Sequence, residues 1–178
     1  MVSLGCPKNL VDSEIMLGLL KAGHFQIARD VDACDVALIN TCAFIEDSRK
    51  ESIDQILELA QRKKDGKIRG LVVTGCLPQK YYAALQEGIA EIDALVGTGE
   101  YARIPEIIEE VLEGKKSTSV EDTRFIYDHE TPRFSVTPPH YKYIKVGEGC
   151  DHRCSFCIIP ELRGDYRSRP IESIVREA

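Results

Sequence analysis

The sequence predicts an α/β fold built on a parallel β-sheet, and two observations carry this prediction. Over residues 1–115, short β-branched runs alternate with longer helical stretches, the pattern of strand–helix–strand units. The central runs, Val36–Ile39 and Leu71–Val73, are apolar throughout, as in strands that helices cover on both faces. The length of 178 residues allows one full domain and the beginning of another.

The first elements each have a local signal. Val2–Leu4 reads as a short first strand. Asn9 can cap a helix that carries apolar residues as far as Leu20, and Gly23 can end it as the glycine just past the last turn. We therefore expect a strand and a helix before the buried strand at Val36–Ile39.

The remaining elements of this first part follow in the same rhythm. After Ser48 we expect a helix whose buried side carries four residues, namely Ile53, Ile56, Leu57 and Ala60. Residues 63–66, two lysines, an aspartate and a glycine, close that helix. After Leu71–Val73 we expect a helix at Tyr81–Glu87, a strand at Ala94–Val96, and a helix at Ile104–Leu112 that stops at Gly114.

The amino-acid composition changes after residue 115. Residues 116–139 are rich in serine, threonine and charge and contain three prolines, which indicates a linker, with a short strand at Arg124–Tyr127. Tyr141–Val146 then alternates as a strand does, and Arg169–Ala178 has helical character with Pro170 at its first position. We expect one strand and one helix here.

The composition limits the classes of function. The net charge of −6 and pI near 5.3 give no basic footprint for docking on nucleic acid by charge alone. No run approaches the ~18 apolar residues of a membrane span, and Met1 leads into no basic and apolar leader, so we expect a cytoplasmic protein without membrane contact. Seven cysteines, an odd number in a chain of this kind, favour metal binding or redox chemistry over disulfides.

Three cysteines follow predicted strands. Cys6 comes after Val2–Leu4, Cys42 after the second strand and Cys76 after the third. Because the carboxyl ends of parallel strands share one edge of a sheet, we expect these thiols to converge. A helix follows each of them, and its N-terminus would lower the thiol pKa.

Three converging thiolates would suit a cuboidal iron–sulfur cluster with one iron left open. Gly5 and Gly75, directly before two of the cysteines, would let the backbone come close to sulfur. The alternative is that Cys6, Cys42 and Cys76 are buried core residues, a common fate of free cysteine. Because all three cysteines follow equivalent strand ends, we favour the iron–sulfur cluster over buried core cysteines.

The motif Cys150-xxx-Cys154-xx-Cys157 is more specific. Its close spacing lets one loop bind three corners of a [4Fe–4S] cube, and the fourth iron then has no protein ligand. The amino and carboxylate groups of S-adenosylmethionine can chelate such an iron, and Phe156 would sit against the loop and the adenine. A zinc site is the alternative, but zinc usually needs a second cysteine pair or histidines, and we expect His152 to face solvent.

The other candidate residues have plainer interpretations. Cys34, just before a predicted strand, is expected to be a structural thiol. Solvated or capping roles are expected for three acidic residues, Asp12, Glu14 and Asp35. Tyr81 and Tyr82 are expected to pack in the core.

Six cysteines arranged in this way resemble the methylthiotransferases, radical S-adenosylmethionine enzymes with two [4Fe–4S] clusters. The matching stretches span nearly the whole chain and are Gly5–Glu14, Asn40–Cys42, Thr74–Cys76 and Cys150–Pro170. The branch that acts on tRNA, beside the anticodon, usually has Gly-Cys-Gln-Met-Asn at the first cysteine. This chain, with Cys6-Pro7-Lys8-Asn9 and with Arg163–Pro170, better resembles the branch that modifies an aspartate of small ribosomal subunit protein twelve.

The resemblance implies a mechanism. One cluster, on Cys150, Cys154 and Cys157, would generate an adenosyl radical that abstracts hydrogen from the β-carbon of the aspartate. The other, on the amino-terminal trio of cysteines, would carry the methylated sulfur that adds to that carbon. A reducing electron donor and the ribosomal protein are the implied partners, with tRNA as the alternative substrate and an iron–sulfur electron-transfer module as the non-enzymatic alternative. Three arginines could assist an acidic substrate or the cofactor carboxylate, or form ion pairs, namely Arg163, Arg167 and Arg169.

The resemblance also implies the domain organisation. We expect a Rossmann-like N-terminal methylthiotransferase domain over residues 1–115 and a linker over residues 116–139. Residues 140–178 would begin a radical S-adenosylmethionine (β/α) barrel, represented by its first βα unit. Family members continue through the rest of that barrel and a small β domain, so we expect a fragment that is inactive alone.

Overall fold

A computed structural model describes residues 1–121 and 125–178. Its centre is a five-stranded parallel sheet in which the strands lie side by side in chain order. The strands are β1 (Val2–Ser3), β2 (Val36–Thr41), β3 (Gly70–Gly75), β4 (Ala94–Val96) and β5 (Ser117–Ser119). The predicted α/β class with a parallel sheet is therefore confirmed. β5 lies within the range that the sequence assigned to the linker.

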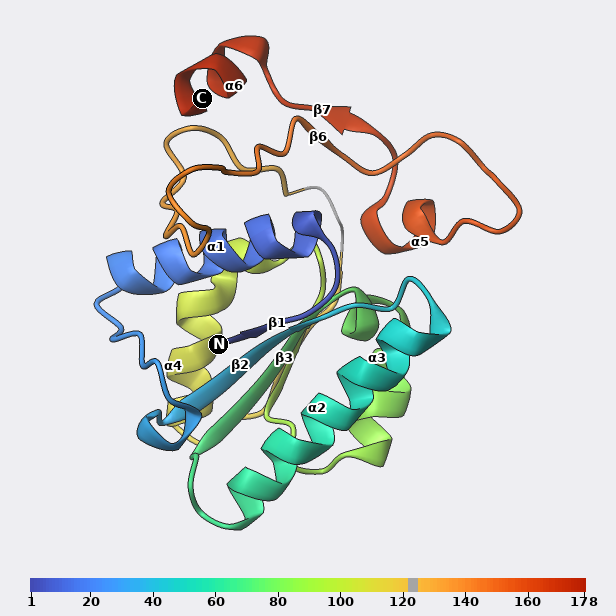
Figure 1. Cartoon of the computed structure of the whole chain (residues 1–178). Helices are drawn as coiled ribbons and strands as arrows, with labels where there is room; N and C mark the ends of the chain where they lie inside the picture. The colour runs from blue at the N-terminus through green and yellow to red at the C-terminus, as the bar shows by residue number, and fades with distance from the viewer. Residues whose placement is uncertain (122–124) are drawn as a thin grey trace.

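Helices cover both faces of this sheet (Figure 1). The helices α2 (Glu46–Lys64) and α3 (Cys76–Gly88) pack on one face, and α1 (Pro7–Ala22) and α4 (Ile104–Leu112) pack on the other. Short 3₁₀ turns, η1 (Val31–Ala33) and η2 (Tyr101–Arg103), precede β2 and α4. Among the described residues, no helix is long and apolar enough to cross a membrane.

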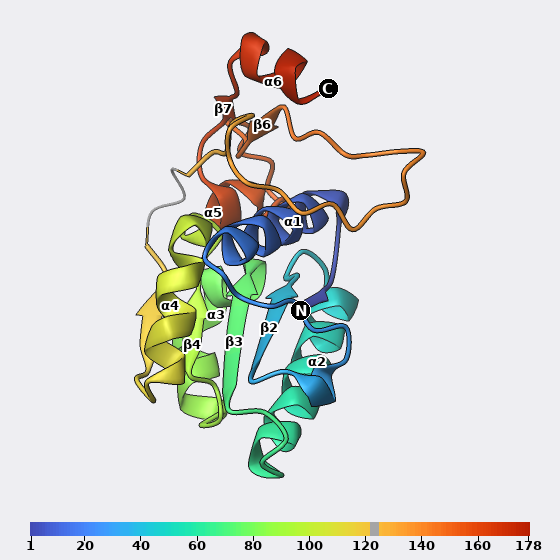
Figure 2. The ribbon, with the colours of Figure 1, turned by 90° about the vertical axis from the view of Figure 1, so that its left-hand side faces the viewer.

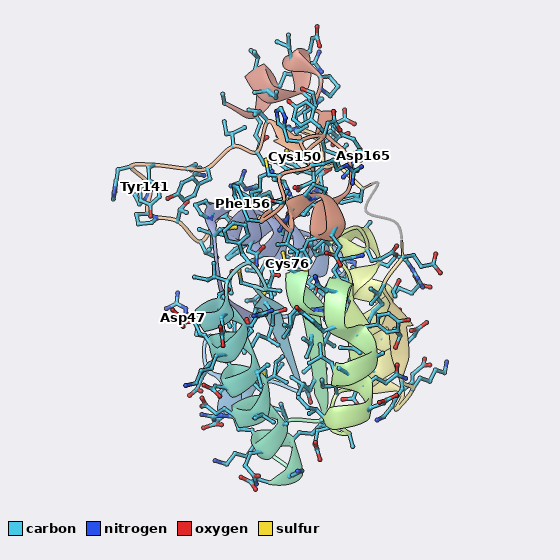
Figure 3. All side chains as sticks on the ribbon, turned by 90° about the vertical axis from the view of Figure 1, so that its right-hand side faces the viewer. Asp47, Cys76, Tyr141, Cys150, Phe156 and Asp165 are labelled. Atoms are coloured by element: carbon cyan, nitrogen blue, oxygen red, sulfur yellow. The ribbon has the colours of Figure 1, made fainter. Side chains whose placement is uncertain are left out.

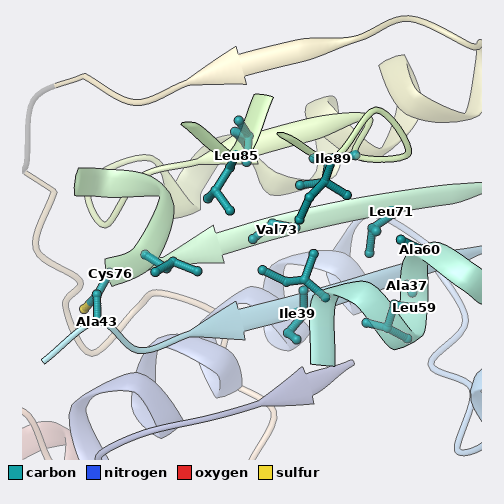
Figure 4. Packing of buried hydrophobic residues seen from close by; sticks show 14 of the residues in the cluster. Ala37, Ile39, Ala43, Leu59, Ala60, Leu71, Val73, Cys76, Leu85 and Ile89 are labelled. Carbon is teal, nitrogen blue, oxygen red and sulfur yellow. The ribbon is translucent and has the colours of Figure 1, made fainter. Parts of the chain in front are cut away.

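The core is split by the sheet into two apolar clusters. Successive residues of each strand point to opposite faces, so Ile39 and Val73 pack under α2 and α3 while Leu38 and Val72 pack under α1 and α4. Figure 4 shows the first cluster, in which Val73 of β3 lies between Ile39 of β2 and the side chains of Leu85 and Ile89. Burial on both faces explains why these strands are apolar throughout, and it supplies the main stabilising free energy.

The register of β2 and β3 aligns the ends of these strands. Thr41 pairs with Gly75, and Asn40 lies between Ser3 of β1 and Thr74 of β3. Residues just past the strands therefore meet at one edge, where Figure 4 shows Ala43 and Cys76 beside the strand tips.

The C-terminal part of the chain lies over α1 (Figures 1 and 2). It contains α5 (Ile159–Arg163), α6 (Ile171–Glu177) and a two-stranded antiparallel ribbon of β6 (Gly147–Glu148) and β7 (Arg167–Ser168). Phe134 donates its backbone N–H to the carbonyl of Glu14 at 2.9 Å. Residues 132–137, which we call the strap, lie over α1. A Cβ at Gly18 would lie 2.3 Å from the carbonyl oxygen of Pro132, so this position of the helix accepts only glycine unless the strap shifts.

The strand predicted at Tyr141–Val146 is wrong. These residues are irregular, and the strand β6 begins only at Gly147. Lys145 gives its backbone N–H to the hydroxyl of Tyr127, at 3.1 Å, in place of a neighbouring strand. The alternation of apolar residues therefore does not reflect a sheet here. Of the strand predicted at Arg124–Tyr127, residue 124 lies outside the described residues, and residues 125–127 are irregular.

The start and end of α1 also differ from the prediction. The helix begins at Pro7 with Cys6 as its N-cap residue, and Asn9 lies inside the first turn. At the other end Gly23 has a φ of −79°, and His24 takes the left-handed conformation with a φ of 66°. Proline suits the first helical position because it has no N–H to satisfy there.

Three further boundaries shift by a few residues. α2 begins before Ser48, whose hydroxyl accepts from the backbone N–H of Ile45 at 3.2 Å, and Ile53 and Leu57 of this helix are exposed. α3 begins at Cys76 and is kinked at Tyr81, where the predicted helix was to start. Pro170 is the N-cap residue of α6.

We predict that Gly75→Ala destabilises the fold by about 2–4 kcal/mol. Gly75 has φ 100° and ψ −150°, a conformation that is essentially restricted to glycine, and a Cβ there would lie 2.3 Å from Asn40 Oδ1. Gly66→Ala is the matched control, because Gly66 has a φ of 72° but no atom within 4 Å of an added Cβ. Urea unfolding should show a clearly larger loss for Gly75→Ala; equal losses would contradict the close approach.

Candidate metal centre

A pocket of about 980 Å³ lies at the carboxyl ends of β1, β2 and β3, and three thiols line it. They are Cys6, Cys42 and Cys76, each from a different strand end, as the sequence predicted for their position. Cys42 and Cys76 are buried, whereas Cys6 is exposed. The walls are completed by apolar side chains of the loop after β2 and of α5, namely Phe44, Ile45, Ile159 and Leu162.

Asn9 connects the three loops that carry these cysteines. Its amide nitrogen donates to the carbonyl of Leu4, two residues before Cys6, at 3.1 Å, and to that of Thr41 at 2.9 Å. Its amide oxygen lies 3.8 Å from the sulfur of Cys76. One fully buried side chain of α1 therefore holds the ends of β1 and β2 against the start of α3.

Glycine and serine fix Cys42. Gly5 has a φ of 90°, and a Cβ at this position would lie 2.7 Å from the Cβ of Cys42. The loop that carries Cys6 can therefore approach Cys42 this closely only because residue 5 is glycine. The buried hydroxyl of Ser52 accepts from the backbone N–H of Cys42 at 3.1 Å and donates to its carbonyl at 3.0 Å. The serine escapes sequence analysis because it lies in the middle of α2 with no motif around it.

Burial raises the pKa of the Cys76 thiol to about 11, and the charge of Arg163 opposes this shift. The expectation that a helix N-terminus would lower the thiol pKa is therefore wrong for Cys76, although Cys76 is the first residue of α3. Removal of the sulfur from water is the largest cause of this shift.

A buried ion network lies beside the pocket, between α1 and the C-terminal part of the chain. The carboxylates of Asp12 and Glu148 face the cations of Lys145 and Arg163. Arg163 Nη1 lies 3.0 Å from each carboxylate, and Lys145 Nζ lies 2.6 Å from Glu148. Lys8 joins at the surface, 3.2 Å from Glu148.

The network keeps Glu148 and Lys145 charged. Burial alone would raise the pKa of Glu148, but Lys145 and Arg163 outweigh it and lower this pKa to about 2. Burial likewise opposes the charge of Lys145, yet Asp12 and Glu148 raise its pKa. Removing one partner from such a group costs about 3–5 kcal/mol, because the others stay buried without compensation.

A second buried pair holds the strap over α1. Glu14 is completely buried, and Nε of Arg133 lies 2.8 Å from its carboxylate. The backbone N–H of Val136 donates to the same carboxylate at 2.7 Å. The expectation of solvated or capping roles is therefore wrong for Asp12 and Glu14, because C-terminal residues cover both.

The CxxxCxxC motif lies in an irregular loop that extends from β6. Cys150 donates its backbone N–H to the carbonyl of Gly164 at 3.1 Å, and Cys157 donates to the carbonyl of Cys154 at 3.0 Å. Cys154 is exposed, and Phe156 is 90% exposed. Figure 3 shows Cys150 and Phe156 in the segment above the end of the sheet at which Cys76 lies.

The remaining predicted residues fall in other places. Cys34 lies away from the thiol pocket and donates to the carbonyl of Val31 at 3.1 Å. His152 and the side chain of Asp35 are exposed, in agreement with the sequence. Tyr81 packs against the core, whereas Tyr82 is exposed and contradicts the expected core role.

The three arginines have different surroundings. Arg163 is 2% exposed and belongs to the ion network. Arg169 is equally buried, pairs with Glu177 and stacks over the ring of Tyr127 at 4.1 Å. Arg167 donates to the carbonyl of Arg163 at 3.1 Å.

The chemistry of both cysteine sets suits an iron–sulfur cluster, since each set offers three thiols and nothing else of comparable softness. The amino-terminal trio shares one pocket, which is large enough for such a group. Within residues 1–121 and 125–178, no three histidine, cysteine, aspartate or glutamate side chains already stand together as a metal-binding group.

Together, fold and site define a parallel α/β protein with a cysteine-lined pocket at its strand ends. Residues 1–97, more than half of the chain, match the family described as "Uncharacterized protein family UPF0004". The chain belongs to this family.

Similar curated proteins carry the name "Ribosomal protein uS12 methylthiotransferase RimO". The protein of Trichlorobacter lovleyi is 51% identical over 179 residues, which cover 100% of this chain and 40% of the relative. Those of Desulforamulus reducens and Geobacter sulfurreducens are 52% and 49% identical, over 99% and 100% of this chain and 40% of each relative. The chain thus spans about 40% of the length of these relatives.

We predict that the contribution of Glu14 to stability depends on pH. Burial alone would raise the pKa of Glu14, but Arg133 and the backbone N–H of Val136 lower it below the usual 4.5. The stabilisation is therefore complete above pH 4.5 and is lost as the pH falls further. In urea unfolding at several pH values, Glu14→Gln should be less stable than wild type at neutral pH, and the difference should shrink below pH 4.5. A difference that is constant with pH would contradict the ion pair.

Proposed function

We propose that this chain is part of a radical S-adenosylmethionine methylthiotransferase that adds a methylthio group to the β-carbon of an aspartate in ribosomal protein uS12. One observation carries the proposal: thiols from three strand ends line a single pocket. Identity near 50% over the chain to proteins named uS12 methylthiotransferases supports it.

The proposed cofactors are two [4Fe–4S] clusters and S-adenosylmethionine. Cys6, Cys42 and Cys76 would hold one cluster, and a second set, Cys150, Cys154 and Cys157, would hold the other, with Phe156 against the S-adenosylmethionine. Bound there, these groups supply the one-electron chemistry and the sulfur that the insertion of a methylthio group into a C–H bond requires. In this proposal residues 1–115 form the methylthiotransferase domain, residues 116–139 the linker, and residues 140–178 the start of the radical domain.

The chain's own residues prepare the first site. Apolar side chains such as Leu4 and Leu162 exclude water from the inner wall, where Cys42 and Cys76 are buried. Cys6 remains exposed, so the pocket opens on its side. Asn9 and Ser52 hold the backbone next to the cysteines, at Leu4, Thr41 and Cys42.

The proposed partners are the protein uS12 and a reducing electron donor, in the cytoplasm. Neither tRNA as the substrate nor a role in electron transfer alone is favoured by any contact described above. Both remain outcomes of the experiments below.

Iron and sulfide counting tests the cofactor assignment. After anaerobic reconstitution, the full-length protein should hold about eight irons, and replacing Cys6, Cys42 and Cys76 together by alanine should leave about four. Replacing Cys150, Cys154 and Cys157 should also leave about four, whereas Cys34→Ala should retain about eight. Stoichiometric zinc, or iron that is insensitive to the amino-terminal trio, would contradict the assignment.

Mass spectrometry tests the substrate. Cells that lack the gene should contain uS12 without its methylthio group, and the full-length gene should restore it, while the Cys42→Ala variant should not. The tRNA from the same cells serves as the control and should be unchanged. Loss of methylthio groups from tRNA, with uS12 unaffected, would overturn the protein substrate in favour of tRNA.

A further inference from the structure

We propose that Arg163 is a positioning residue of the cysteine-lined pocket, which it joins from the C-terminal part of the chain. This inference rests on the proposed function, since it takes the pocket as the site of a [4Fe–4S] cluster. It adds that the amino-terminal thiols form a complete site only when α5 is docked on the first domain.

The contacts of Arg163 reach three separate elements. Its Nη2 lies 2.7 Å from Asn9 Oδ1, on α1, and donates to the sulfur of Cys76, at the start of α3, at 3.7 Å. Its Nη1 faces Glu148 of β6 and Asp12 of α1 at 3.0 Å. The planar guanidinium thus directs one nitrogen to the thiol pocket and the other to the ion network, which a lysine with a single nitrogen cannot do.

The residue after Arg163 extends this connection to the second cysteine set. Gly164, with a φ of 72°, lets the chain turn back toward β7, and its carbonyl accepts from the backbone N–H of Cys150. The end of α5 therefore touches Cys76 through a side chain and Cys150 through the main chain. It links one cysteine of the amino-terminal trio to one cysteine of the CxxxCxxC motif.

The ion network explains how a cation can lie beside Cys76. A guanidinium that is 2% exposed would be costly without partners, and Asp12 and Glu148 provide them. The other nitrogen, Nη2, donates to Asn9 Oδ1 and offers positive charge and an N–H donor to the sulfur of Cys76. Positive charge and hydrogen bonds to ligand sulfur raise the reduction potential of an iron–sulfur cluster, because they stabilise the additional electron.

Docking of α5 does not depend on Arg163 alone. Leu162 is 1% exposed in the core, and its carbonyl accepts from the hydroxyl of Thr98 at 2.6 Å. Glu161 pairs with Lys80 of α3 at 3.0 Å. A substitution at Arg163 therefore leaves these anchors of α5 in place. Arg163→Gln also removes one cation from the ion network, whereas Arg163→Lys keeps a positive charge there.

The test uses the full-length protein in which Cys150, Cys154 and Cys157 are alanine, so that only the amino-terminal cluster remains. Arg163→Gln and Arg163→Lys are compared in this background after anaerobic reconstitution. Arg169→Lys is the matched control, because Arg169 is as deeply buried in the same segment but does not line the pocket. Iron content and the midpoint potential are measured, the latter by a redox titration followed by electron paramagnetic resonance.

We expect a midpoint potential shifted to more negative values in Arg163→Gln, a smaller shift in Arg163→Lys, and none in Arg169→Lys. Loss of iron from both Arg163 variants, with Arg169→Lys retaining it, would equally support the proposal. Four irons at the unshifted potential in Arg163→Gln would overturn it while leaving the proposed function intact. No iron in the parent background would overturn the proposed function itself, and the role of Arg163 with it.

Discussion

The structure depends on the register between β2 and β3. Thr41 pairs with Gly75, and each of these last strand residues is followed directly by a cysteine. Cys42 and Cys76 therefore leave the sheet side by side. β1 pairs with β2 one strand further along and brings the loop of Cys6 to the same edge. A shift by one residue would turn every side chain of a strand to the other face and would separate these thiols.

α1 is the element on which both halves of the molecule rest. Its polar residues Asn9, Asp12 and Glu14 are completely buried, and each has a different structural role. Asn9 holds the strand ends, Asp12 holds the network around Arg163, and Glu14 holds the strap at Arg133. Buried charges are a poor source of stability compared with apolar packing. Here they connect the C-terminal part of the chain to α1, beside the thiol pocket.

The sequence was sufficient for the parts of the fold that follow from local patterns. Apolar runs bounded by turns predicted four of the strands, and their parallel arrangement predicted the meeting of three thiols at one edge. β5 was missed because Ser117–Ser119 is short and polar and is a strand only through its pairing with β4. The roles of Asp12 and Glu14 were missed because a helix covered on all sides has no polar face to compare with an apolar one. Tyr141–Val146 shows the opposite error, since alternation alone does not supply a neighbouring strand.

The central claim is that thiols from three strand ends grip one iron–sulfur cluster, and anomalous X-ray scattering at the iron edge tests it most directly. Crystals of the reconstituted full-length protein should show iron density in the pocket between Cys6, Cys42 and Cys76, with all three sulfurs bound to it. An iron-free pocket, or iron held by fewer than these three thiols, in a protein whose CxxxCxxC motif carries its own cluster, would contradict the account.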